Sequence, residues 1–115
     1  MTALEQKLNY SFRDPALLKT ALTHSSYANE NRRQELVCNE RLEFLGDAVL
    51  GLTVAAWLYR TYPRLPEGRM TKMRAELVCE QSLAGAAEEL QLGAYLRLGH
   101  GEELSGGRTR PSILA

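Results

Sequence analysis

Three carboxylates share one side of an otherwise apolar stretch, CNERLEFLGDAVLGL, which covers residues 38–52. If this stretch is helical, successive side chains rotate by about 100°, so Glu43 and Asp47 lie at about 300° and 340° relative to Glu40. The aliphatic side chains fall on the opposite side of the helix, at Leu42, Leu45, Val49, Leu52 and Ala56. The sequence therefore predicts an acidic stripe along a helix whose other face is buried.

The acidic stripe has two explanations. Exposure to solvent, the helix dipole and a cap at Asn39 would account for Glu40, which lies at the helix start. They account poorly for Asp47, because it lies two turns into the helix, where the dipole contributes little. Carboxylates one turn apart also repel each other by about 0.2–0.5 kcal/mol per pair. A local conflict of this kind is typical of a functional site.

A divalent cation shared by Glu43 and Asp47 would turn this repulsion into a binding site. No histidine or cysteine lies on the stripe, so the ligands are oxygen atoms and the favoured cation is Mg²⁺ or Mn²⁺. Protein-bound Mg²⁺ usually completes its shell with water and phosphate oxygens. The stripe therefore indicates a phosphate-ester substrate, although two carboxylates are few for two-metal phosphodiester chemistry.

The segment NERLEFLGDAVL, residues 39–50, resembles the signature of the ribonuclease III family. The resemblance extends over essentially the whole chain, and it is closer to the nuclease domain of bacterial ribonuclease III than to the compact Mini-ribonuclease III type. Helical periodicity throughout the chain, with no convincing strand, predicts an all-α fold, and the resemblance implies a ribonuclease III endonuclease-domain-like helical bundle. The flanking segments that agree in order and spacing are ALTHSSYANE (21–30), EGRMTKMRAELV (67–78), LGAYLRLGHGEELSGGR (92–108) and PSILA (111–115).

The resemblance assigns roles to individual residues. Glu43 and Asp47 match the two acids of the signature helix that bind the catalytic Mg²⁺, and Mn²⁺ is expected to substitute for it. Glu40 and Glu67 match further acids that the family brings near the cleavage centre. Phe44 matches an aromatic residue that packs into the partner subunit of a homodimer; packing in the core of its own chain is the alternative.

The implied activity is Mg²⁺-dependent endonucleolytic cleavage of double-stranded RNA, without an organic cofactor, to 5′-phosphate and 3′-hydroxyl ends with short 3′ overhangs. A noncatalytic RNA-binding or ribosome-associated module of the same fold is the alternative. Double-stranded RNA is bound mainly through its shape, phosphates and 2′-hydroxyls. The basic residues expected to meet phosphates, each with ordinary surface charge as the alternative, are Arg69, Lys72, Arg74, Arg108 and Arg110.

The family pattern continues past the residue at which this sequence stops. In the family, SILA is followed at once by an Asp and, three residues later, by a Glu, on a helix that supplies the other two metal ligands. This sequence stops at Ala115. We therefore expect residues 1–115 to form a nuclease domain that is incomplete at its C-terminal end, lacks a downstream double-stranded-RNA-binding domain and is impaired in activity.

Helical periodicity and capping signals predict the elements that position the acidic stripe. A short helix is expected from Leu4 to Leu8, and a second after Asp14, a cap residue, and Pro15, which suits the first helical position. Proline residues end the stripe helix, which is expected over about 39–62. Two more helices are expected over 67–78 and 80–90, whereas the polar link SSYANENRRQ (25–34) and the glycine-rich segment LGHGEELSGGRTRP (98–111) are expected to be loops.

Composition matches an ordinary globular domain, with 44% hydrophobic residues and a formal net charge of zero from 14 basic and 14 acidic residues. The apolar run over 48–58 is shorter than the roughly 18–20 residues of a bilayer span, so we expect it to be a core segment and expect no membrane association. The N-terminus lacks the features of a secretory signal, so we expect a cytoplasmic protein. Cys38 and Cys79 are expected to be reduced and buried. His24 is expected to have a structural role, and His100 to be exposed in a loop.

Overall fold

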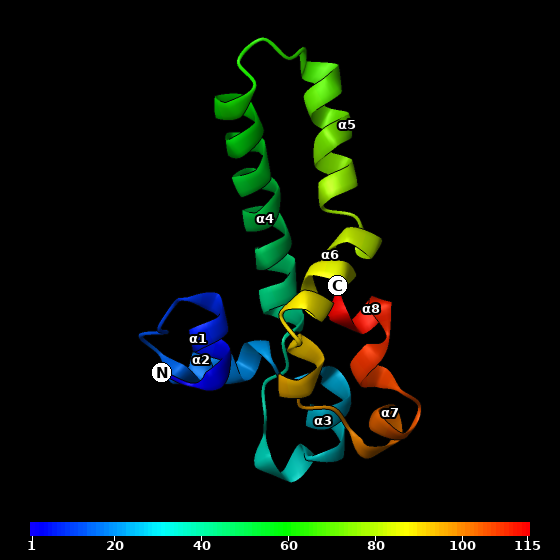
Figure 1. The fold of residues 1–115 in the computed structure, drawn as a ribbon. Helices are drawn as coiled ribbons and strands as arrows, with labels where there is room; N and C mark the ends of the chain where they lie inside the picture. The colour runs from blue at the N-terminus through cyan, green and yellow to red at the C-terminus, as the bar shows by residue number, and fades with distance from the viewer.

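The computed structural model describes residues 1–115 and is helical throughout (Figure 1). This confirms the all-α class; the one β-type contact is an isolated bridge between Thr23 and Arg97. The α-helices are α1 (Ala3–Leu8), α2 (Pro15–Ala21), α3 (Ser25–Glu30), α4 (Glu40–Thr61), α5 (Glu67–Leu77), α6 (Glu80–Glu89), α7 (His100–Leu104) and α8 (Pro111–Leu114). The 3₁₀ turns are η1 (Arg32–Gln34), η2 (Leu92–Tyr95) and η3 (Gly107–Thr109).

The helices predicted from periodicity begin and end close to the expected residues. Helix α1 begins with a capping box, in which the Thr2 hydroxyl and the Glu5 carboxylate each accept the backbone N–H of the other residue. The Asp14 carboxylate caps α2 by accepting the N–H of Ala16. These local signals can be read from sequence because donor and acceptor lie within one helical turn.

Two segments predicted to be loops contain helices, and those predictions were wrong. Helix α3 occupies part of the polar link, and α7 occupies the centre of the glycine-rich segment. The Glu30 carboxylate at the end of α3 accepts the N–H groups of His100 and Gly101 at the start of α7. Helix α7 is therefore stabilised by a residue distant in the sequence, and His100 is exposed at a helix start rather than in a loop.

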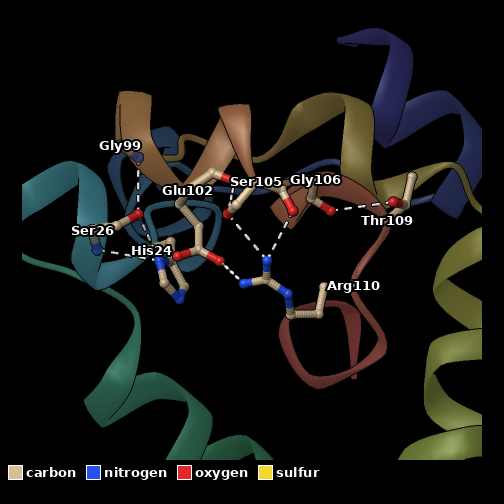
Figure 2. A network of polar contacts seen from close by, with 8 residues as sticks. All are labelled: His24, Ser26, Gly99, Glu102, Ser105, Gly106, Thr109 and Arg110. Carbon is tan, nitrogen blue, oxygen red and sulfur yellow. Dashed lines mark hydrogen bonds and ion pairs between the residues drawn. The ribbon is translucent and has the colours of Figure 1, made fainter.

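The expected structural role of His24 is confirmed. Its Nδ1 accepts the backbone N–H of Ser26 at 3.1 Å and caps α3. The Ser26 hydroxyl in turn accepts the N–H of Gly99 at 2.8 Å, so the start of α3 is joined to the segment that enters α7 (Figure 2). The backbone N–H of His24 donates to the Arg97 carbonyl at 3.0 Å, beside the Thr23–Arg97 bridge.

A long antiparallel hairpin of α4 and α5 extends from a cluster of shorter helices (Figure 1). Helix α6 packs against α8, and α7 packs against α3. The radius of gyration is 16.2 Å, whereas a compact domain of this length has about 13 Å. The accessible surface is 8554 Å², compared with about 6,300 Å² for a compact monomer of this mass. Much apolar surface thus has no partner within the chain.

The core is small, and it corrects several expectations. Its buried apolar residues are Leu4, Leu58, Ala84, Ala87 and Leu98. Only Leu58 comes from α4, so the prediction of a core segment over 48–58 was wrong. The aliphatic face of α4 is largely exposed, with Leu52 at 71%. Cys38 is partly exposed and Cys79 is exposed, so the two free thiols are not buried.

By length and composition alone, the 22 residues of α4 could cross a membrane. The sequence argument considered only the shorter apolar run and missed this property. One such helix is weak evidence, because the core helix of a soluble protein passes the same test. Only 6% of the apolar window is buried within this chain, so the question that α4 raises is which surface covers it.

Candidate active site

An open cleft of about 810 Å³ lies where the first half of α4 faces α6 and the end of the chain. Its walls combine acidic side chains with a few apolar ones. The residues that line it are Glu40, Glu43, Phe44, Gly46, Asp47, Leu50, Glu80, Leu83, Ser112 and Ala115.

The acidic stripe predicted from sequence lines this cleft. Glu40, Glu43 and Asp47 all lie on α4 and are exposed to solvent. Glu43 and Asp47 are one turn apart, about 6 Å along the helix axis. No hydrogen bond or ion pair in the structure engages any of the three carboxylates; the two ion pairs of the chain lie elsewhere. Their mutual repulsion is therefore not compensated within the chain.

Asn39 anchors the start of α4, although not as the side-chain cap that the sequence predicted. Its side chain makes no cap hydrogen bond to α4. Instead, Nδ2 donates to the Ala21 carbonyl at 3.1 Å, and the backbone N–H donates to the Thr23 carbonyl at 2.8 Å. Both acceptors lie at the end of α2 or just after it. Asn39 thereby fixes the start of the acidic stripe relative to the helical cluster.

Glu80 is a fourth acid of the cleft that the sequence reasoning did not identify. It is the first residue of α6, where a carboxylate interacts favourably with the helix dipole. The only sequence signal was its place at the start of a predicted helix. Its place opposite the stripe depends on how α6 packs, which no local pattern encodes.

Glu67 lies apart from the other acids within one chain. It begins α5 and lines a different pocket, beside Leu58 and Tyr59 near the far end of α4. Its Oε1 accepts the Thr71 hydroxyl at 2.7 Å. Asp47 and Leu58 are separated by about 16 Å along the helix axis. A single chain therefore does not bring Glu67 to the acidic cleft.

Phe44 is 83% exposed, so the alternative of packing in its own core is wrong. It lies between the acidic cleft and a second, more apolar groove of about 780 Å³. That groove is formed by α2, the segment before α4 and the first turns of α4. Its lining residues are Leu17, Thr20, Val37, Cys38, Glu40, Arg41, Leu42, Phe44 and Leu45. Trp57 and Tyr59 are also exposed.

The five predicted phosphate contacts divide into two groups. Arg69, Lys72 and Arg74 are exposed on α5 and form no ion pair within the chain. Arg108 and Arg110 lie near the end of the chain and are partly buried. Both already donate hydrogen bonds to backbone carbonyls and to a carboxylate.

Two carboxylates with lowered pKa lie outside the cleft and join segments of the fold. Backbone N–H groups of Thr2 and Phe12 lower the pKa of Glu5 to about 2. The N–H groups of His100 and Gly101 lower the pKa of Glu30. Each carboxylate is held ionised by donors from its surroundings, as expected when hydrogen bonds favour the charged form. Glu5 therefore fastens the segment after α1 to that helix, and Glu30 joins α3 to the start of α7.

The acids of the cleft have the ligand chemistry that a hard divalent cation requires, but too few of them lie close enough together to hold one. Carboxylate oxygens are the ligands that Mg²⁺ and Mn²⁺ prefer, and none of the four acids is committed to another cation. However, the chain places no group of three or more His, Cys, Asp or Glu side chains where they could hold a metal ion together. Within these residues the donor set is incomplete.

Comparison with known proteins gives consistent matches. The profile of the family described as Ribonuclease-III-like matches residues 14–115. A protein named ribonuclease 3 from Oceanobacillus iheyensis is 62% identical over 112 residues, which are 97% of this chain and 49% of that protein. A ribonuclease 3 from Caldanaerobacter subterraneus subsp. tengcongensis is 56% identical over 115 residues, or 100% of this chain and 50% of that protein. The chain spans about half the length of these curated relatives.

A solved structure shares the fold. The nuclease domain of ribonuclease III from Campylobacter jejuni matches with a TM-score of 0.87 and 46% sequence identity, over 96% of this chain and 73% of that chain. That structure is described as flexible in the region involved in dimer formation. Profile, sequence identity and fold agree over nearly every residue, and the chain belongs to the ribonuclease-III-like family.

Proposed function

We propose that the protein to which these residues belong is a Mg²⁺-dependent endoribonuclease that cleaves double-stranded RNA. The observation that carries the proposal is the pair Glu43 and Asp47, one turn apart, unpaired and facing a cleft, in a chain of this family. Selection for stability alone gives no reason for two uncompensated acids on an apolar helix.

Each acid of the cleft has a role in this proposal. Glu43 and Asp47 hold the cation, and the rigid helix keeps their oxygen atoms in one orientation. Glu40 and Glu80 add negative charge to the same cleft, which raises the local concentration of divalent cations. When bound, Mg²⁺ supplies Lewis-acid stabilisation of the phosphodiester and activates water for in-line attack. The expected products carry 5′-phosphate and 3′-hydroxyl ends.

The remaining ligands come, in this proposal, from residues that follow Ala115 in the longer protein. Ala115 and Ser112 line the cleft with the acids of α4, so a chain that continues from Ala115 starts beside Glu43 and Asp47. The family pattern has an Asp at the next position and a Glu three residues later, on one helical face. This addition would complete a set of ligands that the described residues leave incomplete.

A homodimer explains the exposed apolar surface and the position of Glu67. Phe44 stands out from α4 beside an apolar groove, which suits insertion into a second copy of the chain. The nuclease domain of the Campylobacter jejuni relative has a region involved in dimer formation, which supports this assembly. Because Glu67 is distant from the acids of its own chain, we propose that it acts near the cleft of the other subunit.

RNA contact is proposed for Arg69, Lys72 and Arg74, the exposed basic residues of α5. Phosphate contacts position a duplex without reading its sequence, and the zero net charge of the chain leaves this task to local groups. The proposed site of action is the cytoplasm.

A noncatalytic RNA-binding module is the second candidate, because the described residues do not assemble three ligands. The deciding experiment incubates the full-length protein with a long RNA duplex in Mg²⁺, in Mn²⁺ and, separately, in Ca²⁺, with EDTA-treated controls. The proposal expects Mg²⁺-dependent cleavage of the duplex to 5′-phosphate ends, and little cleavage of the separated strands. Binding of the duplex without cleavage in Mg²⁺ or Mn²⁺ would instead support the noncatalytic module.

A further inference from the structure

The end of the chain is fastened by the side chain of Arg108. Its Nη1 donates to the carbonyl of Gly93 at 2.9 Å and to that of Leu96 at 2.6 Å. Its Nε donates to the Glu103 carboxylate at 2.9 Å, and this ion pair lowers the pKa of Glu103. One guanidinium therefore joins η2, α7 and η3. Charge-assisted hydrogen bonds of this kind are stronger than neutral ones.

The backbone around Arg108 is packed as closely as its side chain. A Cβ atom at Gly93 would clash with the carbonyl oxygen of Arg108. A Cβ atom at Gly107 would lie 2.7 Å from the Cγ of Glu102. Glycine at both positions lets η2 and α7 approach η3 on either side. The strap, defined here as residues 107–110, therefore has little room to shift.

Arg110 joins the strap to α7 and to the residue that follows it, through partners other than Glu103. Its Nη1 donates to the Glu102 carboxylate, and its Nη2 donates to the carbonyl and the hydroxyl of Ser105 (Figure 2). Its own carbonyl accepts the N–H groups of Ile113 and Leu114 at 3.0 Å, which starts α8. The residue that closes the strap thus also sets the direction of the last helix.

Helix α8 leads from the strap to the acidic cleft. It packs against α6, and Ser112 and Ala115 line the cleft together with Glu43 and Asp47. The start of any chain that continues from Ala115 is therefore fixed by the strap. A shift of the strap would move that start relative to α4.

We propose that Arg108 is a positioning residue that sets the metal affinity of the cleft by holding α8, and that it is not a phosphate contact. The inference rests on the proposed function. Nε and one terminal nitrogen of the guanidinium are already engaged within the chain, and only the other terminal nitrogen has no partner. The side chain is 33% exposed, so most of it is not accessible to a phosphate. Arg69, by contrast, is exposed and free of ion pairs, as a phosphate contact requires.

The test uses the full-length protein and four substitutions. Arg108→Gln removes the charge and the fork of donors, whereas Arg108→Lys keeps a charge that can reach one carbonyl group but cannot reproduce the fork. Arg69→Gln is the matched change at a proposed phosphate contact. Arg13→Gln is the control at an exposed arginine that has no hydrogen-bond partner in the structure. Circular dichroism establishes the temperature at which each variant is folded.

Two measurements separate positioning from phosphate contact. Electron paramagnetic resonance of free Mn²⁺ gives the metal affinity without RNA or cleavage. The salt dependence of duplex binding in Ca²⁺ gives the number of phosphate contacts. For Arg108→Gln we expect Mn²⁺ affinity to fall by roughly ten- to a hundredfold, with an unchanged salt slope. For Arg69→Gln we expect unchanged Mn²⁺ affinity and a salt slope smaller by about 1.

Arg108→Lys should show an intermediate Mn²⁺ affinity, and it decides the question if Arg108→Gln does not fold. A folded Arg108 variant with wild-type Mn²⁺ affinity would overturn the positioning role. A reduced salt slope for that variant would make Arg108 a phosphate contact instead. Absence of Mn²⁺ binding by the wild-type protein would overturn the proposed function itself, and the positioning role with it.

Discussion

Ala115, the last residue of the chain, lines the same cleft as Asp47, which lies in the first half of α4. The packing of α8 against α6 creates this proximity. The strap, residues 107–110, holds α8 in this position. The acids of α4 thus face the last residue of the described chain, beside which the proposed function places the remaining ligands. This relationship links the incomplete ligand set to the fold and motivates the predictions about the cleft.

Neutralising either proposed ligand should separate cleavage from binding. In the full-length protein, Glu43→Gln or Asp47→Asn should lower the rate of duplex cleavage by roughly a hundredfold or more, while duplex binding in Ca²⁺ persists. Without metal, either change should leave the free energy of unfolding unchanged or raise it by a few tenths of a kcal/mol, because repulsion is relieved. Denaturant unfolding and gel-based cleavage assays measure both effects.

Glu89→Gln is the matched control for these substitutions, because Glu89 is an exposed acid on α6 that does not line the cleft. It should leave the cleavage rate unchanged. Wild-type cleavage by Glu43→Gln would refute the assignment of the ligands, and a clear loss of metal-free stability would refute the account of the stripe as strained.

Phe44→Ala should weaken the proposed homodimer with little effect on the fold of each chain. Aromatic residues at the centre of an interface often contribute about 2 kcal/mol or more, so the dissociation constant should rise at least about tenfold. Sedimentation equilibrium of the full-length protein measures it. Leu104→Ala is the control, because Leu104 is 75% exposed on α7, away from α4. Equal dissociation constants for the two variants would exclude Phe44 from the interface.

Glu5 should make stability depend on pH in the acid range. Its pKa is about 2 in the folded chain, below the ordinary value of 4.5, so folding favours its ionised form. Its contribution to stability is complete above about pH 4.5 and is lost as the pH falls towards 2. The melting temperature of Glu5→Gln should therefore decline less steeply than that of the wild type over this range. Parallel declines for both proteins would contradict this role of Glu5.

Gly93→Ala should lower stability, because the added methyl group would meet the carbonyl of Arg108. Overpacking of this kind costs about 1–3 kcal/mol. At Gly101, within α7, a Cβ atom meets nothing within 4 Å. Gly101→Ala should therefore be neutral or stabilising by up to about 1 kcal/mol. Denaturant unfolding distinguishes the two, and equal stabilities would show that the backbone near Arg108 can adjust.

Sequence reasoning succeeded where the determinants are local. The acidic stripe follows from helical periodicity, and Asp14 and Pro15 mark the start of α2 through contacts within one turn. It failed for α7, because the Glu30 carboxylate that secures this helix is distant in the sequence. It missed Glu80 for the same reason, since the packing of α6 determines what this residue faces.

The prediction that α4 is buried failed for a different physical reason. The apolar periodicity of Leu45, Val49 and Leu52 indicates that this face requires a partner. It does not indicate whether the partner belongs to the same chain. In the described residues the face is exposed, and a second copy of the chain is its proposed cover.

The most direct test of the central claim compares two proteins in Mg²⁺-dependent cleavage of a long RNA duplex. One is the 115-residue chain, and the other continues from Ala115 through the helix that begins with the expected Asp and carries Glu three residues later. The account predicts cleavage by the longer protein, and little or none by the shorter one, because Glu43 and Asp47 hold only part of the ligand set. Absence of cleavage by either protein, with duplex binding retained, would contradict the account.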